Sequence, residues 1–521
     1  MTSRRGLLQQ ALASSVTWAP SPAAWANVVP STPGRAALVI GNERYRQNPL
    51  SSAANDARAM AALLTQAGFA VDLKLNATRE QMVGAIDALG QAAASRDVGT
   101  ALFYYAGHAA QLDWRNYLLP VDGDVESASD IRKQCVDLGV LLSRLYRVKN
   151  KTALIILDAC RDDPFGPRFR PPQKGMTQYD APAGTLLAFA TAPGRVAIEV
   201  QGSPNGLYTE HLLRELPVRG VRIEDALKRV RLNVRVASNG AQVPWESTSL
   251  ENDVYLFPTP KLSEAELERQ AREEYEAWTK IKGSSNPNDW IDFLRRHPNG
   301  KFAEAAQVRM RRLLPGMEPA PPAAAGRKPL QLGPKIPVPS RFKGSGNPNS
   351  AGTYPFRPVW TPGDEYEFLD LDLYSSVVRS KFKVVVKRVD AANNRVELAD
   401  GSLLDLTGGV LKEGNKRRYD PAMQINPAEL QIGRKWATRL QQSGEGSGTV
   451  DYDFRITARE MVKVPAGEFA AFRIEGKGSF LGRPLQLTRW VVPGINFSVR
   501  REIRQFVSAR VLVAARQAVS G

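Results

Sequence analysis

The stretch ALFYYAGH at residues 101–108 decides the fold, because an unbroken apolar run ends there at a glycine–histidine pair. A short apolar run without polar alternation is typical of a strand that is buried on both faces of a parallel sheet. Residues 36–40, 152–157 and 186–190 repeat this pattern, and helical patterns lie between the runs. The alternation predicts an α/β sandwich over residues 35–260, in which helices flank a mostly parallel sheet.

The end of this region is expected to add two helices and one more strand. Apolar residues recur at helical spacing over residues 207–216 and 223–236. A short apolar segment at residues 254–257 is expected to form the last strand of the sheet.

Two reactive side chains follow neighbouring strands of the predicted sheet: His108 ends the strand at residues 101–108, and Cys160 follows the strand at residues 152–157. Ligands of an open α/β sheet bind outside the carboxyl ends of its strands, and sequential strands joined by a crossover are usually neighbours, so the two side chains are expected to lie close together. A nearby imidazole makes a thiol an effective nucleophile at neutral pH. The spacing alone leaves open an alternative, in which the cysteine is a small buried residue and the histidine a satisfied polar one.

Three segments resemble the caspase and metacaspase family of cysteine peptidases. They are FYYAGH at 103–108, LDACR at 157–161 and ATAPG at 190–194, and the histidine precedes the cysteine by about 50 residues, as in that family. The resemblance implies a cysteine endopeptidase in which His108 is the general base and acid and Cys160 is the nucleophile. It also implies that the backbone N–H groups of Cys160 and Ala109 hold the oxyanion, although the family usually has glycine at the second position.

The resemblance also bears on substrate specificity, through Asp158 and Glu199. In the family, the residue two positions before the cysteine lines the pocket for the substrate residue that precedes the cut, and this chain has Asp158 there, as metacaspases do. Animal caspases place an arginine five residues after the Pro-Gly pair, where an ungapped count in this chain reaches Glu199. Two carboxylates attract arginine or lysine and repel aspartate, so cleavage after basic residues is expected.

The alternative reading of these carboxylates is structural. Asp158 then caps the turn that follows it, and Glu199 lies in a solvated loop. A third carboxylate, Asp56, stands where a helix is expected to start, and it is interpreted as a helix cap rather than as part of the pocket.

The segment between the expected nucleophile and the next strand is basic. Residues 161–184 contain Arg168, Arg170 and Lys174 among prolines and glycines. In the family this segment is the linker where self-cleavage occurs. A basic linker suits an enzyme that cuts after basic residues, so self-processing at this segment is a hypothesis of the sequence.

Four further segments complete the chain. Residues 1–26 resemble a twin-arginine export signal that ends in small residues, which predicts an exported protein in a bacterial periplasm. Residues 262–314 are expected to form a helical hairpin that serves as a spacer. Residues 315–363 hold twelve of the 36 prolines and are expected to be a semi-rigid linker. Residues 364–515 are expected to form a β-rich domain of unknown role, as an antiparallel sheet or open barrel.

Composition narrows the classes of function. The chain has 521 residues, of which 43% are hydrophobic and 24% charged, so it is neither mainly disordered nor a polytopic membrane protein. The net charge of +17 is spread along the chain and does not by itself predict nucleic-acid binding. Two cysteines exclude a disulfide scaffold, and Cys135 is expected to be a structural thiol. No cofactor is predicted, and the sequence does not decide whether the acidic residues at 122–130 create a calcium requirement.

Two rival functions stay open beside the peptidase. One is a non-catalytic caspase-like interaction module, and the other is an envelope-binding protein whose function resides in residues 364–515. The peptidase, with a protein or peptide substrate, is favoured because a scaffold has no chemical need for the pair of His108 and Cys160. No apolar run reaches about 18 residues, so no transmembrane segment is expected.

Overall fold

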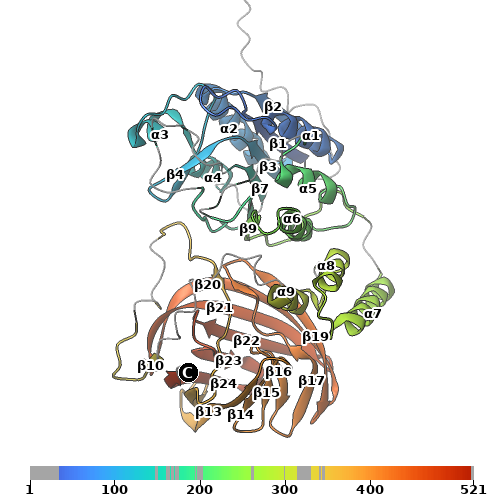
Figure 1. The fold of residues 1–521 in the computed structure, drawn as a ribbon, viewed down its shortest axis with the longest axis vertical. Helices are drawn as coiled ribbons and strands as arrows, with labels where there is room; N and C mark the ends of the chain where they lie inside the picture. The colour runs from blue at the N-terminus through green and yellow to red at the C-terminus, as the bar shows by residue number, and fades with distance from the viewer. Residues whose placement is uncertain are drawn as a thin grey trace, which may run out of the picture.

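The computed structural model describes residues 34–146, 151–159, 165, 169, 175–193, 195, 197, 203–259, 263–298, 300–313, 330–339, 342 and 347–517. It consists of an α/β domain, three helices and a barrel-like β domain (Figure 1). The predicted export signal at residues 1–26 lies outside the described residues, so export stays a prediction. No described helix has both the length and the apolar character needed to cross a membrane.

A six-stranded sheet forms the centre of the α/β domain, in the order β2-β1-β3-β7-β8-β9. The first five strands are parallel, and β9 runs antiparallel to β8 at the edge. The predicted fold class is therefore confirmed. The strands are β1 (Gly34–Gly41), β2 (Phe69–Leu75), β3 (Val98–Ala106), β7 (Thr152–Asp158), β8 (Thr185–Phe189) and β9 (Trp245–Thr248).

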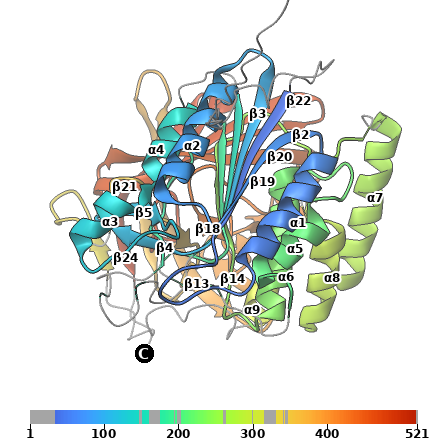
Figure 2. The same cartoon turned by 90° about the horizontal axis from the view of Figure 1, so that it is seen from above.

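Helices cover both faces of this sheet and create two apolar cores (Figure 2). Alternate residues of β1 enter different cores: Ala37 and Val39 pack on one face, and Ala36 and Leu38 on the other. This double burial explains why the strands are unbroken apolar runs. The first face is covered by α1 (Ala53–Gln66), α5 (Leu207–Glu215) and α6 (Ile223–Ala237), and the second by α2 (Arg79–Ala94) and α4 (Leu138–Tyr146).

The strand expected at residues 254–257 is wrong. The last strand is β9, whose polar sequence WEST hides it from a search for apolar runs. Within 254–257 the chain instead makes an isolated bridge from Tyr255 to Arg222, and the carbonyl groups of Tyr255 and Leu256 accept hydrogen bonds from Arg35. A small sheet that the sequence did not predict follows β3, formed by β4 (Ala109–Leu112), β5 (Arg115–Leu118) and β6 (Val136–Asp137), with α3 (Ala128–Gln134) before β6.

The helical spacer contains three helices rather than a two-helix hairpin. They are α7 (Glu264–Ile281), α8 (Pro287–Arg296) and α9 (Ala303–Leu313), and Pro298 lies between the last two. Trp278, Trp290, Phe293 and Phe302 form their shared core. Trp278 stacks on Phe302 with 5.3 Å between ring centroids, so aromatic burial holds these short helices together.

The C-terminal domain is a twelve-stranded antiparallel barrel-like sheet. It closes because the strands at the two ends of its order, β24 and β23, pair with each other. The sequence left an open barrel or a sheet, and closure removes the unpaired edges of either. The strands are β12 (Glu365–Asp372), β13 (Val378–Asp390), β14 (Arg395–Leu398), β15 (Leu403–Leu404), β16 (Val410–Glu413), β17 (Arg417–Met423), β19 (Lys435–Gly444), β20 (Gly448–Val464), β21 (Gly467–Phe480), β22 (Arg483–Val491), β23 (Arg500–Ile503) and β24 (Ser508–Gln517).

Residues 315–363 are not a linker throughout. Leu330–Leu332 forms β10, which extends the sheet at the end of β24, and Tyr354–Pro355 forms β11, which pairs with β18 (Glu429–Leu430). Residues 347–351 bind the α/β domain at Asp180: its N–H donates to the Asn349 carbonyl at 2.9 Å, and its carboxylate accepts from the Ala351 N–H at 2.7 Å. The linker prediction rested on proline content, which gives no information about such hydrogen bonds.

A second contact between the domains centres on the turn before β19. The Nζ of Lys435 lies 3.4 Å from a carboxylate oxygen of Glu224, and Gln431 donates to the Glu246 carbonyl at 2.7 Å. Gly433 has a φ of +86°, and a Cβ at this position would lie 1.7 Å from the carbonyl oxygen of Thr248 on β9. The backbone of the barrel-like domain at Gly433 therefore contacts the backbone of β9, the edge strand of the α/β sheet.

Replacement of Gly433 tests this contact, with Gly401 as the matched control. Both glycines have a backbone in the left-handed region, but a Cβ at Gly401 (φ +80°) meets nothing within 4 Å. We expect Gly401→Ala to cost about 1 kcal/mol of unfolding free energy from backbone strain alone, and Gly433→Ala to cost roughly 2 kcal/mol more from overpacking. Thermal unfolding measures this difference. Equal losses in the two variants would show that the domains do not meet at Thr248.

Candidate active site

The candidate site lies at the edge of the sheet where β3 and β7 end. These neighbouring strands pair in register, with Ala106 opposite Asp158, and the N–H of Gly107 donates to the Asp158 carbonyl at 3.3 Å. His108 lies two residues beyond one strand, and Cys160 lies two residues beyond the other. Cys160 is outside the described residues, so the predicted His108–Cys160 contact itself stays a prediction.

The imidazole of His108 is buried, with 1% of the residue exposed. Its Nε2 lies 2.7 Å from the carbonyl oxygen of Asn48, and its ring packs on Tyr45 with 4.5 Å between centroids. A carbonyl oxygen only accepts hydrogen bonds, so Nε2 carries the proton in the neutral imidazole. The lone pair is then on Nδ1, which becomes the basic atom of this histidine.

Two tyrosine hydroxyls hold the backbone of His108. The Tyr45 hydroxyl accepts the His108 N–H at 3.0 Å and lies 3.2 Å from the Leu119 carbonyl. The Tyr105 hydroxyl lies 2.7 Å from the His108 carbonyl. A Cβ on Gly107 would lie 2.6 Å from both hydroxyl oxygens. Glycine before the histidine is therefore required for these tyrosines to reach the main chain.

At the end of β7, two carboxylates approach the same small residue. Asp158 ends β7 and accepts a hydrogen bond from the Thr209 hydroxyl at 2.7 Å. Asp56, on the first turns of α1, accepts from the side chain of Asn205 at 2.8 Å and from the N–H of Gly206 at 3.0 Å. A Cβ on Gly206 would lie 3.3 Å from Asp56 and 3.4 Å from Asp158. The two acidic side chains therefore converge on Gly206.

The two carboxylates influence each other electrostatically. Burial and, to a smaller extent, the charge of Asp158 raise the pKa of Asp56 to about 7, whereas the hydrogen bonds from Asn205 and Gly206 oppose the rise. A like charge close to a buried carboxyl disfavours ionisation. The carboxyl group of Asp56 therefore ionises less readily than that of an exposed aspartate.

The interpretation of Asp56 as a helix cap is wrong. Ser52 is the N-cap of α1, and the Asp56 N–H donates to the Ser52 carbonyl at 2.8 Å inside the helix. Its carboxylate instead accepts the N–H of Gly206, the N-cap of α5. The sequence offered one signal for this role: an acidic residue in the helix that starts at the carboxyl edge of the first strand.

Of the other predicted residues, Ala109 lies within the described part of the chain and the rest do not. Ala109 is described and begins β4. Glu199 and the basic linker residues Arg168, Arg170 and Lys174 lie outside the described residues. The predicted oxyanion and pocket roles therefore stay predictions.

Cys135 and His211 lie outside the candidate site. Cys135 is a buried free thiol, as expected, and burial raises its pKa to about 12, which makes it a poor nucleophile. His211 is buried in α5. Among the described residues, no group of three or more His, Cys, Asp and Glu side chains is placed to hold a metal ion.

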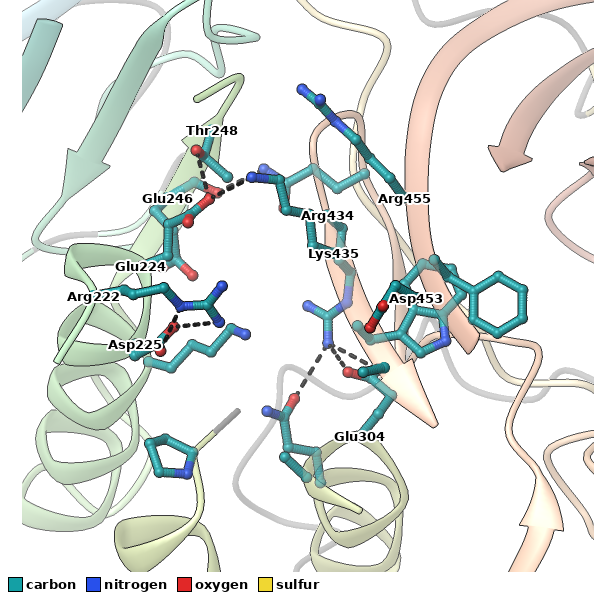
Figure 3. Close-up of a pocket in the computed structure, with 18 of the residues that line it drawn as sticks. Arg222, Glu224, Asp225, Glu246, Thr248, Glu304, Arg434, Lys435, Asp453 and Arg455 are labelled. Atoms are coloured by element: carbon teal, nitrogen blue, oxygen red, sulfur yellow. Dashed lines mark hydrogen bonds and ion pairs between the residues drawn. The ribbon is translucent and has the colours of Figure 1, made fainter. Parts of the chain in front are cut away.

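A separate cavity of about 540 Å³ lies between the two domains and is lined by α6, β9, α9 and β19–β21 (Figure 3). Its labelled cations and carboxylates are largely paired: Arg222 with Asp225 at 3.0 Å, and Arg434 with Glu304 at 2.9 Å. His108 and the carboxylates near Gly206 do not line it. This cavity belongs to the domain interface rather than to the candidate active site.

Comparison with known proteins identifies the α/β region. The family model of the caspase domain matches residues 34–255, which run from β1 past β9 and include every described residue of the site. The match covers a little less than half of the chain. No curated protein matches the chain.

The raised pKa of Asp56 predicts a pH-dependent effect of Asp56→Asn on stability. The folded state holds this proton more tightly than the unfolded chain, so the contribution of the group is complete below about pH 4 and is lost as pH rises through about 7. The amide does not ionise. We expect its melting temperature to exceed that of the native chain by roughly 2–6 °C at pH 8 and to match it at pH 4.5.

Thermal unfolding at the two pH values makes the comparison. Asp87→Asn, on an exposed carboxylate of α2 paired with Arg144, is the control and should show no gain at pH 8. A gain for Asp56→Asn that is the same at both pH values would contradict the electrostatic explanation.

Proposed function

Residues 34–255 form a caspase domain, and on this premise we propose that the protein is a cysteine endopeptidase that cleaves after arginine or lysine. The observation that carries the proposal is the register of β3 and β7, which brings the ends of the His108 and Cys160 strands to one edge. A caspase domain supports cysteine peptidase chemistry on a protein substrate. The identity of the preferred residue rests on the two carboxylates beside Gly206.

The reaction proceeds by acyl transfer. Nδ1 of His108 takes the proton of the Cys160 thiol, and the thiolate attacks the scissile carbonyl carbon. The tetrahedral intermediate collapses, the C–N bond breaks, and His108 returns the proton to the leaving amine. Water, deprotonated by the same imidazole, then hydrolyses the thioester and restores the thiol. The bond from Nε2 to the Asn48 carbonyl keeps the ring in the orientation and tautomer that these steps need.

The backbone N–H of Ala109 is suited to hold the oxyanion of the intermediate. Leu119 donates to the His108 carbonyl at 3.0 Å, so His108–Leu119 has the position of a hydrogen-bonded pair, although the His108 N–H donates to the Tyr45 hydroxyl instead. The next pair, Ala109–Leu118, is therefore a non-bonded pair, and the Ala109 N–H points away from β5. Because β4 is the outer strand of its three-stranded sheet, this N–H faces an open edge. A preorganised main-chain donor of this kind stabilises developing charge.

Asp158 and Asp56 supply the preference for a basic residue. Both carboxylates lie within 3.4 Å of the Cβ position of Gly206, so a larger residue there would crowd them. A guanidinium or ammonium group there compensates both charges, whereas an aspartate side chain adds a third negative charge. In this proposal, Asp56 joins Asp158 in the substrate-binding role that was predicted for Asp158 and Glu199.

Peptides that carry Arg, Lys or Asp before a reporter group test the activity, with and without calcium. We expect turnover of the Arg and Lys peptides, a loss of roughly 1,000-fold or more in kcat/KM for Cys160→Ala and His108→Ala, and no loss for Cys135→Ala. Asp158→Asn should impair the Arg peptide by about 100-fold, because one buried charge partner is removed. Preference for the Asp peptide would refute the pocket, and no turnover at all would favour a non-catalytic interaction module.

Self-processing in residues 161–184 is a separate prediction of the same specificity. Incubated active protein should be cut after Arg168, Arg170 or Lys174, and the Cys160→Ala protein should stay intact. Intact-mass spectrometry identifies the bond. Replacing the three basic residues with glutamine should abolish the cut but leave turnover of peptides measurable. A chain that cleaves peptides and never cuts itself would contradict this prediction and leave the peptidase proposal standing.

A further inference from the structure

Three arginines lie side by side in the barrel-like domain, far from the caspase domain's residues in the sequence. Strand pairing places Arg489 of β22 opposite Arg501 of β23, and Arg501 opposite Arg510 of β24. Side chains that are directly opposite in an antiparallel pair point to the same face. On β22 this is the buried face, because Leu487, Arg489 and Val491 are buried and their neighbours are not. The three guanidinium groups therefore form one row on the interior face of the closed sheet.

The described carboxylates near this row are fewer than its arginines, and each of them already contacts an arginine. Asp370 of β12 lies opposite Arg510 and binds it with two contacts, at 2.8 and 3.0 Å. Glu413, the other carboxylate that acts on Arg501, lies 3.8 Å from Arg417. Like charges placed directly opposite each other destabilise a sheet. The row therefore has an excess of positive charge that the described residues do not neutralise.

Within the described part of the chain, the two remaining arginines have no carboxylate partner of their own. Arg489, 5% exposed, donates there to neutral oxygens: the Ser498 hydroxyl, the Ile425 carbonyl and the Asn426 amide. The side chain of Arg501 makes no hydrogen bond or ion pair with any described residue. Burial, with a smaller effect of the neighbouring arginine, lowers the pKa of Arg489 to about 9 and that of Arg501 to about 10.

Solvent reaches the middle of the row. Arg501 is partly exposed, and it lies only three residues before the turn at Arg504–Phe506 that ends its strand. The Phe382 ring lies under Arg510, 4.3 Å from its guanidinium carbon, which helps to fix the orientation of that side chain. A cationic site that is fixed, under-neutralised and open to solvent is what an oxyanion needs, because guanidinium groups bind phosphate and carboxylate through paired N–H donors.

We propose that Arg489, Arg501 and Arg510 form a binding site for a phosphate group, which enters from the end of the barrel-like domain that carries the Arg504–Phe506 turn. The phosphate is shared by inorganic phosphate and by anionic lipid headgroups. Apolar side chains at this end give the second source a reason: Tyr374 is 79% exposed and Phe506 62% exposed, and their turns are joined by a hydrogen bond from Leu373 to the Val507 carbonyl.

Arg501→Gln and Arg500→Gln are the matched pair for the test. Arg500 is the neighbouring residue on β23, so its side chain points to the opposite face, where it binds Glu502 at 2.6 Å and lies over the Trp490 ring. Neither residue belongs to the caspase domain. Arg501→Gln should fold, because it removes repulsion, and an unchanged or raised melting temperature checks this. Arg501→Lys keeps the charge and should keep part of the affinity.

Calorimetric titration of the full-length chain with inorganic phosphate, against sodium chloride of equal ionic strength, is the first arm. Cosedimentation with phosphatidylglycerol vesicles, against phosphatidylcholine vesicles, is the second. We expect at least a tenfold loss of phosphate binding for Arg501→Gln and less than a twofold change for Arg500→Gln. Vesicle binding with the same variant pattern and no binding of free phosphate supports the site with a lipid headgroup as its ligand. Absence of binding in both arms, or equal losses in the two variants, overturns the proposal.

Discussion

The register between β3 and β7 is the constraint on which the candidate site depends. With Ala106 opposite Asp158, the residues that follow the two strands emerge at the same edge and at the same height. A shift by one residue would turn every apolar side chain of either strand to the other face, so two packed cores fix the alignment. The chemistry of the site is thus specified by the burial of side chains that take no part in it.

Much of this arrangement could be predicted from the sequence, because buried parallel strands are apolar runs and His108 directly follows one of them. The limits are equally physical. Asp56 was misread because its partners, Asn205 and Gly206, are about 150 residues away and belong to another helix. Strand β9 was missed because its sequence is polar. Cys160 and Glu199 lie outside the described residues, so the sequence remains the source of their assignment.

Some buried charges of the barrel-like domain are paired with carboxylates, and others are not. At the domain interface, Arg434 binds Glu304 and Glu429, and Lys435 binds Glu224, in agreement with the rule that buried ions are paired. The row of Arg489, Arg501 and Arg510 departs from that rule within the same domain. Departures of this kind concentrate where a protein does something besides fold. The residue pattern of the individual strands does not predict the row, because the row is created by cross-strand register.

The contacts of residues 347–351 with the α/β domain bear on the fate of a chain that is cut within residues 161–174. Strand β8, which follows the cut, pairs with β7, which precedes it. The Asn349 side chain also donates to the Trp114 carbonyl at 2.5 Å, which is a second contact between the two fragments. A nick in that interval leaves the two fragments assembled as one particle, with unchanged hydrodynamic size. Gel filtration alone would then count the nicked and the uncut protein as the same species.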